Sequence, residues 1–231
     1  MKMHNADDAD RFINHFRSVL TNICTIRGKK KLLLKKILVV GLIDSLSKTK
    51  SHDKKTHKKR YISFLDNYSN WVDKDRVSAQ QIIVHPECSD RSTLFQLCNE
   101  RVASWPEGIF LFPNSDPSYN ESLKAASSDE RKVVEDCTYK SLFYQYRCFL
   151  IHEFREPGKP LIESDESTPY YHSLSRVTSD EIHRDGFQLC FPFLFLTNIA
   201  TNCIDTLATE LQRNPINLRS IYKSSTSWHN S

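Results

Sequence analysis

The chain has 231 residues, of which 39% are hydrophobic and 26% are charged, and its formal net charge is +4. This length and balance predict a globular protein that can bury a sizeable core. With only 5 glycines and 9 prolines, the composition argues against a turn-rich all-β sandwich and favours long helices.

The sequence carries no sign of export or of membrane insertion. Its first residues, MKMHNADDADRF, are acidic and amphipathic, unlike the basic start and apolar core of a secretory signal. The longest apolar run, 37–43, is far shorter than the roughly 18 residues that a membrane span needs. The 7 cysteines are odd in number and widely spaced, as is typical of reduced thiols. We therefore expect a cytoplasmic protein with no membrane partner.

Two amphipathic or apolar segments predict the first two helices. Apolar residues at helical spacing predict a helix that ends near Gly28, and 30–46 is apolar nearly all round, as in a buried central helix. The polar tract 47–60 is then a basic loop, and 53–60 is the part that we expect to be disordered.

Positive charge is concentrated in residues 27–60. This range holds 13 lysines and arginines against two aspartates, a net charge of +11, whereas the rest of the chain has 19 against 26, a net charge of −7. Such a stretch is either an electrostatic footprint for a polyanion or a solvated helix end followed by a loop. The sequence supports both interpretations equally.

Further helices are predicted in the middle of the chain. Apolar spacing indicates a helix around 61–71 and a short one around 94–102, the latter within an otherwise irregular insertion at about 75–120. A long helix is predicted from about 128 to 154, where Pro157-Gly158 breaks the pattern.

The last third of the chain is expected to be partly irregular and then helical. Residues 157–190 form a second insertion, a polar loop with room for one short β-hairpin. Pro192 suits the first turn of a final helix with an apolar stripe. The expected fold class is therefore mainly α, a helical bundle with irregular insertions. A single domain over 1–222 would be followed by a flexible tail at 223–231.

Arg147 and His152 stand out because they are charged or titratable within the largely apolar segment YQYRCFLIHEFREPG. In an α-helix, five positions correspond to a rotation of about 140°, so the two side chains should not share a face. A second copy across a two-fold axis would complete one cleft, which points to a homodimer. The pair suits RNA, because histidine can exchange protons with the 2′- and 5′-oxygens while arginine holds the phosphate.

This R-x4-H element resembles the signature of the HEPN superfamily, helical-bundle proteins that include many metal-independent ribonucleases of toxin–antitoxin and antiphage systems. The stretch LFYQYRCFLIHEFREPG and the late FPFLFL at 191–196 are also similar to a bacterial HEPN-like group. Cys148 departs from the Asn, Asp or His that usually follows the arginine. The resemblance implies that Arg147 stabilises the phosphate and the transition state, that His152 is the general acid or base, and that no cofactor is needed.

Five neighbouring residues are further candidates for substrate binding. Tyr144 and Tyr146 are suited to stacking on bases or to the core, and Glu153 to orienting the histidine, to binding a metal or to the surface. Arg155 and Lys159 are suited to phosphate contacts or to a helix C-terminus.

The expected function is a metal-independent endoribonuclease that leaves a 2′,3′-cyclic phosphate. By resemblance it would be a toxin or antiphage defence effector that acts on tRNA or mRNA, restrained by an antitoxin or another regulatory protein. The alternative is a non-catalytic HEPN-like module that binds nucleic acid or protein. In a purely structural alternative, Arg147 forms an ion pair with Asp136 or Glu153.

A weaker alternative is a helical zinc protein. Cys148 and His152, at positions i and i+4, have metal-ligand spacing, and Cys137, or His85 with Cys88, would supply further ligands. The sequence contains no G-x-S-x-G, G-x4-G-K-[ST] or G-x-G-x-x-G element, which argues against a serine hydrolase and against nucleotide-driven chemistry.

Overall fold

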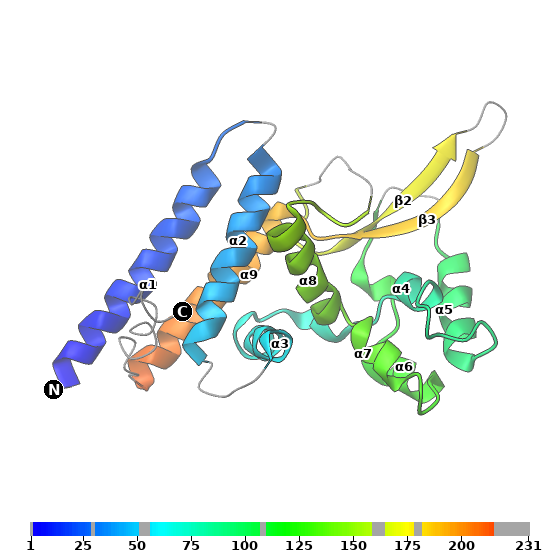
Figure 1. Cartoon of the computed structure of the whole chain (residues 1–231), viewed down its shortest axis with the longest axis horizontal. Helices are drawn as coiled ribbons and strands as arrows, with labels where there is room; N and C mark the ends of the chain where they lie inside the picture. Colours follow the sequence, from blue (N-terminus) through cyan, green and yellow to red (C-terminus); the bar gives the residue numbers. More distant parts are fainter. Residues whose placement is uncertain are drawn as a thin grey trace. The chain divides into compact units, whose positions relative to one another are not determined.

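The computed structural model describes residues 2–28, 31–50, 56–106, 110–158, 165–177 and 182–214. These residues are mainly helical with one small antiparallel sheet (Figure 1), which confirms the predicted fold class at this level. No helix among them is long and apolar enough to cross a membrane.

The chain divides into two compact units. Unit 1 comprises Met1–Trp71, Arg147–Arg155 and Leu196–Ser231, and unit 2 comprises Val72–Tyr146 and Glu156–Phe195. The single domain expected over 1–222 stays a prediction, and the tail expected at 223–231 lies outside the described residues.

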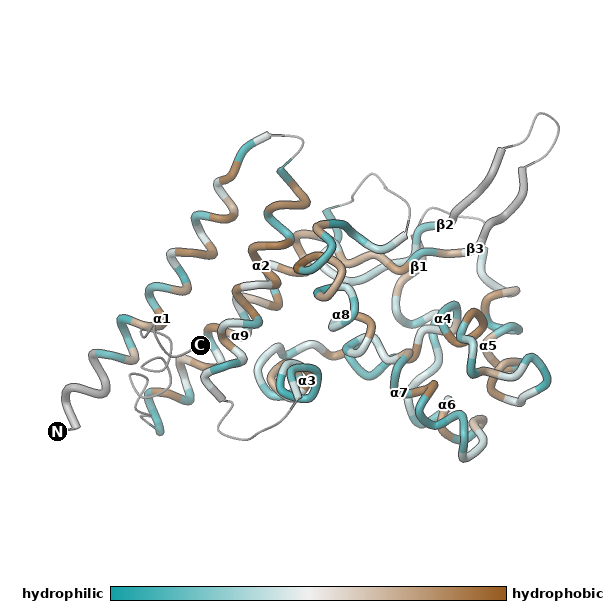
Figure 2. The backbone as a smooth tube through the Cα atoms, viewed as in Figure 1, coloured by the Kyte–Doolittle hydropathy of each residue, from teal (hydrophilic) through white to brown (hydrophobic). Residues whose placement is uncertain are grey.

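The described part of unit 1 is mainly helical. Its helices are α1 (Lys2–Thr25), α2 (Leu32–Ser47), α3 (His57–Tyr68) and most of α9 (Phe193–Arg213). The helices α1 and α2 lie side by side (Figure 1), and α2 is apolar along most of its length (Figure 2). The apolar stripe predicted on the final helix is confirmed, because all its members are buried: Phe195, Ile199, Cys203, Ile204, Leu207 and Leu211.

The start of α3 differs from the sequence-based expectation. Residues 57–60 were expected to be disordered, but they form the first turn of this helix. Thr56 caps it by accepting a hydrogen bond from the backbone N–H of Lys59 at 3.4 Å, which satisfies one of the free donors at a helix start. Lys48–Lys50 form a 3₁₀ turn after α2, and 51–55 lie outside the described residues.

Unit 2 combines short helices with the sheet. Its helices are α4 (Ala79–Ile83), α5 (Thr93–Ala103), α6 (Tyr119–Ala125), α7 (Arg131–Asp136) and most of α8 (Tyr139–Cys148), with 3₁₀ turns at Val72–Asp75 and Pro113–Ser115. Its strands, in the antiparallel order β1-β2-β3, are β1 (Phe110–Leu111), β2 (Tyr170–Val177) and β3 (Ile182–Cys190). The predicted hairpin is therefore confirmed and is longer than expected. The predicted insertion at about 75–120 is more regular than expected, because Ser78, Ser92 and Ser118 each cap a helix.

The long helix predicted from 128 to 154 was wrong, because it is interrupted at Cys137 and Thr138. The Cys137 carbonyl accepts from the N–H of Ser78 at 2.9 Å, and the N–H of Tyr139 donates to the Arg76 carbonyl at 2.8 Å. These backbone groups bond to a distant segment instead of to the next helical turn, so α7 and α8 are separate helices.

A buried carboxylate organises the core of unit 2. Asp116 is fully buried, and its Oδ2 accepts hydrogen bonds from the hydroxyls of Tyr139 at 2.5 Å and Tyr171 at 2.6 Å. Its Oδ1 accepts from the N–H of Ala79 at 2.8 Å. Burial raises the pKa of Asp116 to about 6, and the three hydrogen bonds offset only part of that effect.

Candidate functional site

Arg147 and His152 lie where α8 passes into a π-helical turn, Phe149–Glu153. A π-turn links residues i and i+5, so positions five apart come about one turn apart. Nη1 of Arg147 accordingly lies 3.2 Å from Nε2 of His152. The prediction that the two side chains do not share a face was wrong, because this segment is wound more loosely than an α-helix. A second copy of the chain is not needed to bring them together.

The π-turn is held against α2 and ends abruptly. Leu150 is buried, and a Cβ placed on Gly41 of α2 would lie 3.8 Å from Cδ1 of Ile151. Phe154 then adopts a left-handed conformation with φ 54°, which is uncommon for an aromatic residue, and its side chain is 69% exposed. The apolar residues thus anchor the turn, while His152 stays at the surface.

Asp44 of α2 is the anionic partner of Arg147. Oδ2 of Asp44 lies 3.2 Å from Nη2 of Arg147. The structural alternative predicted Asp136 or Glu153 as the partner, and this prediction was wrong. Burial is the largest single effect and lowers the pKa of Arg147, but the Asp44 carboxylate and the Cys148 sulfur together more than offset it, so the pKa of Arg147 is raised.

Arg60 of α3 binds the other oxygen of the same carboxylate. Its Nη2 lies 3.4 Å from Oδ1 of Asp44 and 3.0 Å from Nδ1 of His57, and its Nε donates to Oγ of Ser47 at 3.2 Å. Two arginine–histidine pairs therefore meet on one aspartate. We call the five side chains the Asp44 cluster: Asp44, His57, Arg60, Arg147 and His152.

The Asp44 cluster combines nearly buried charges with exposed histidines. The side chains of Asp44, Arg60 and Arg147 are 13%, 11% and 10% exposed, whereas His57 and His152 are exposed. Two guanidiniums against one carboxylate leave the cluster positive, which favours an anionic ligand. Imidazole is the side chain that ordinarily titrates close to neutral pH. The arrangement can therefore hold an anion and exchange protons with it.

The two tyrosines expected near the site have different surroundings. Tyr146 is only 3% exposed, its hydroxyl donates to Oε2 of Glu156 at 2.9 Å, and its ring packs against Phe143 and Phe191. These contacts support the core role for Tyr146 rather than base stacking. Tyr144 is half-buried.

The charged candidates after the histidine bind one another. Oε2 of Glu153 lies 2.7 Å from Nη2 of Arg155, so the glutamate meets this arginine rather than orienting the histidine. The Arg155 guanidinium also lies over the Phe149 ring, 4.7 Å from its centre. Lys159 lies outside the described residues.

The zinc alternative receives no support from the thiols proposed for it. Burial raises the pKa of Cys137 to about 12, so this thiol stays protonated at neutral pH, and metals bind the thiolate. Sγ of Cys148 lies 4.0 Å from Nη1 of Arg147. Among the described residues, no group of three or more His, Cys, Asp or Glu side chains is placed to hold a metal ion.

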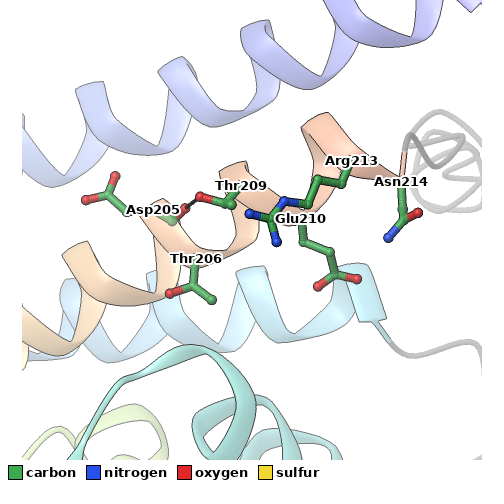
Figure 3. A pocket seen from close by; sticks show the side chains of 6 residues that line it. All are labelled: Asp205, Thr206, Thr209, Glu210, Arg213 and Asn214. Carbon is green, nitrogen blue, oxygen red and sulfur yellow. Dashed lines mark hydrogen bonds between the residues drawn. The ribbon is translucent and has the colours of Figure 1, made fainter.

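A separate hollow of about 480 Å³ lies along the end of α9 in unit 1 (Figure 3). Its lining residues are Asp205, Thr206, Thr209, Glu210, Arg213 and Asn214. Asp205 forms an ion pair with Arg17 at 2.8 Å, and Oε2 of Glu210 accepts a hydrogen bond from the hydroxyl of Tyr68. These carboxylates join α9 to α1 and α3, so they have structural partners.

Sequence reasoning missed three members of the Asp44 cluster. Asp44 was not singled out, although a lone carboxylate in the apolar run ILVVGLID calls for a buried partner. His57 and Arg60 were assigned to a disordered loop. The signal that could have placed them is Thr56, a capping residue directly before a helical apolar pattern.

The chain matches no protein-family model, no curated protein and no solved structure. The likeness to the HEPN superfamily therefore rests on the sequence features described above, and the functional argument rests on the geometry of the Asp44 cluster.

Proposed function

We propose that the protein is a metal-independent endoribonuclease whose reactive pair is Arg147 and His152. The observation that carries this proposal is the 3.2 Å contact between Nη1 of Arg147 and Nε2 of His152. The contact places a nearly buried charge-stabilising group next to an exposed proton-transfer group. A phosphodiester that entered there would meet both at once.

The proposed reaction is transesterification within the RNA. The 2′-hydroxyl loses its proton to a base and its oxygen attacks the neighbouring phosphorus, while the bond from phosphorus to the 5′-oxygen breaks and that oxygen takes a proton. The products are a 2′,3′-cyclic phosphate and a 5′-hydroxyl. Arg147 would stabilise the charge that builds on the phosphoryl oxygens, and His152 would carry one of the two protons. DNA would be spared, because deoxyribose has no 2′-hydroxyl.

The non-catalytic alternative is favoured by a different observation, the ion pair of Arg147 with Asp44. Because both side chains are nearly buried, the arginine has a structural partner without any substrate. In that case the protein would bind nucleic acid or a partner protein without cutting RNA. The tRNA or mRNA substrate, the homodimer, the regulatory partner and the role as a toxin or defence effector all remain part of the proposal.

Incubation of the purified protein with total tRNA and a structured messenger in EDTA tests the proposed function. We expect the wild type to cut RNA and to leave cyclic phosphate and 5′-hydroxyl ends. The His152→Ala variant should cut about 10²–10⁴ times more slowly, the usual range for loss of a general acid or base.

The matched control for this experiment is His15→Ala, which removes an exposed histidine from α1 and should leave the rate unchanged. Absence of cleavage by the wild type, or equal rates for the wild type and His152→Ala, would contradict the proposal and favour the binding module.

We also expect the basic stretch to steer RNA toward the site. Lys48 and Lys59 are both exposed and lie between Asp44 and Arg60 in the sequence, and Nζ of Lys48 lies 4.0 Å from Oδ2 of Asp44. Reversing both charges to glutamate should weaken RNA binding and reduce the slope of log affinity against log salt by about 1.4, since each phosphate contact on a single strand contributes about 0.7.

Titrations of binding affinity against salt measure this slope. The control is Arg131→Glu with Lys132→Glu, which makes the same change in net charge at exposed positions of unit 2. If both double variants alter the slope equally, the effect comes from net charge alone, and the prediction that the basic stretch steers RNA is wrong.

A further inference from the structure

We propose that His57 is the second proton-transfer group of the site, so that one copy of the chain supplies both the acid and the base. This inference rests on the proposed ribonuclease function and extends it to a residue outside the R-x4-H element. Its basis is the chain of contacts in the Asp44 cluster, which runs without interruption from one exposed histidine to the other.

The contact chain has the same order of groups on both sides of Asp44: a guanidinium next to the carboxylate and then an imidazole. Nδ1 of His57 lies 3.0 Å from Nη2 of Arg60, and the same Nη2 lies 3.4 Å from Oδ1 of Asp44. On the other side, Oδ2 of Asp44 lies 3.2 Å from Nη2 of Arg147, whose Nη1 lies 3.2 Å from Nε2 of His152. Each histidine therefore has its own guanidinium, and the carboxylate fixes the two guanidiniums relative to each other.

The reaction itself needs two proton-transfer groups. One takes the proton from the 2′-hydroxyl and the other gives a proton to the departing 5′-oxygen, and the two oxygens lie on opposite sides of phosphorus in an in-line displacement. A single histidine cannot stand on both sides at once. His57 and His152 lie at the two ends of the contact chain, each beside its own guanidinium, so the chain offers one imidazole for each of the two proton transfers.

The positions of these side chains are well supported by their elements. His57 is the first residue of α3, next to the capping Thr56, and Arg60 lies one turn later, so the helix itself brings the pair together. The guanidinium of Arg60 is further fixed by its bond to Ser47, which is fully buried. His57 remains exposed and can meet a substrate from solvent.

The test measures single-turnover cleavage of an RNA oligonucleotide across a range of pH, for the wild type, His57→Ala, His57→Gln and His152→Ala. The glutamine variant retains an acceptor for Arg60, so it separates proton transfer from the positioning of that arginine. We expect the wild type to show a bell-shaped pH profile. Each histidine variant should lose about 10²–10⁴-fold in rate and should keep only one limb of the bell.

A second substrate assigns the proton-transfer step. In an RNA whose scissile 5′-oxygen is replaced by sulfur, the leaving thiolate needs no proton. This substrate should restore the rate of whichever variant lacks the acid and should leave the other variant slow. Rescue of one variant but not the other supports the inference, and rescue of neither overturns it.

Three further outcomes would also overturn the inference. A wild-type rate for both His57 variants, with His152→Ala inactive, would refute His57 and leave the proposed function standing. A slower His57 variant that keeps both limbs of the pH profile would show a structural or binding role only. An inactive wild type would refute both proposals. His15→Ala again serves as the exposed-histidine control, and urea unfolding confirms that each variant is folded.

Discussion

Replacing Arg147 by lysine should lower the rate of RNA cleavage by about 10²–10³-fold and lower the free energy of unfolding by only about 1 kcal/mol. The lysine keeps a positive charge for Asp44, so the nearly buried carboxylate still has two cationic partners, the lysine and Arg60. Its single nitrogen cannot contact Asp44 and His152 together, as Nη2 and Nη1 of the arginine do at 3.2 Å each. Activity and stability should therefore respond very differently to this substitution.

Arg147→Ala should instead damage both properties. It removes the guanidinium from the proposed transition state, and it removes a cation from a pair whose two members are nearly buried. We expect at least the loss in rate expected for lysine, together with a loss of about 1–3 kcal/mol in stability, because the Asp44 carboxylate loses one of its two guanidinium partners and keeps only Arg60. Single-turnover kinetics and urea unfolding measure the two effects on the same preparations.

The double variant Arg147→Ala with Asp44→Asn provides the control for this interpretation. The combined loss in stability should be smaller than the sum of the losses in the two single variants, because both changes break the same ion pair, whereas the activity should stay low, because the guanidinium is still absent. A lysine variant with the wild-type rate would contradict a role of the guanidinium in the reaction. A rate that recovers in the double variant would mean that Arg147 acts only through its ion pair with Asp44.

Regular apolar spacing was the part of the sequence that predicted the fold well. It located the first two helices, α5 and the buried stripe of α9, because burial of one face sets the spacing whatever the details of the neighbours. The break between α7 and α8 could not be found in this way. No glycine or proline marks it, and its cause is the set of hydrogen bonds from Cys137 and Tyr139 to residues 76–78, which are distant in sequence.

The site was predicted only in part, for two physical reasons. Arg147 and His152 were recognised, but the distance between their side chains depends on a π-turn. The residues of this segment also fit an ordinary α-helix, so the sequence does not predict the π-turn. Arg60 was assigned to a disordered tract because lysines and histidines surround it in the sequence. Its ion pair with Asp44 comes from tertiary structure, and local composition carries no information on that contact.

The largest effect on stability is expected at Asp116, in the core of unit 2. Replacing it by alanine should lower the free energy of unfolding by about 3–5 kcal/mol, because two tyrosine hydroxyls and the N–H of Ala79 lose their acceptor inside the protein. Both values apply at pH 4, and there Asp116→Asn should cost less, about 1–2 kcal/mol. The amide keeps one acceptor oxygen, and the hydroxyl of Tyr171 also bonds to Oγ of Ser78 at 2.7 Å.

The wild type and Asp116→Asn should also differ in how the free energy of unfolding depends on pH. Since burial raises the pKa of Asp116 from 3.8 to about 6, the folded state holds this proton more tightly than the unfolded state does. The stability that the group contributes is therefore fully present below pH 3.8 and is lost as pH rises to about 6. A shift of about two pKa units corresponds to about 3 kcal/mol.

Urea unfolding of the wild type and of Asp116→Asn at pH 4 and pH 7 isolates this term, because the other titrating groups are common to both proteins. The wild type should lose about 2.4 kcal/mol more than the variant between these two pH values, because about 0.5 kcal/mol of the effect is already lost at pH 4. An equal loss in both would mean that Asp116 is already ionised at pH 4. In that case the hydrogen bonds from Tyr139, Tyr171 and Ala79 would outweigh burial, and Asp116→Asn should then be nearly as destabilising as Asp116→Ala.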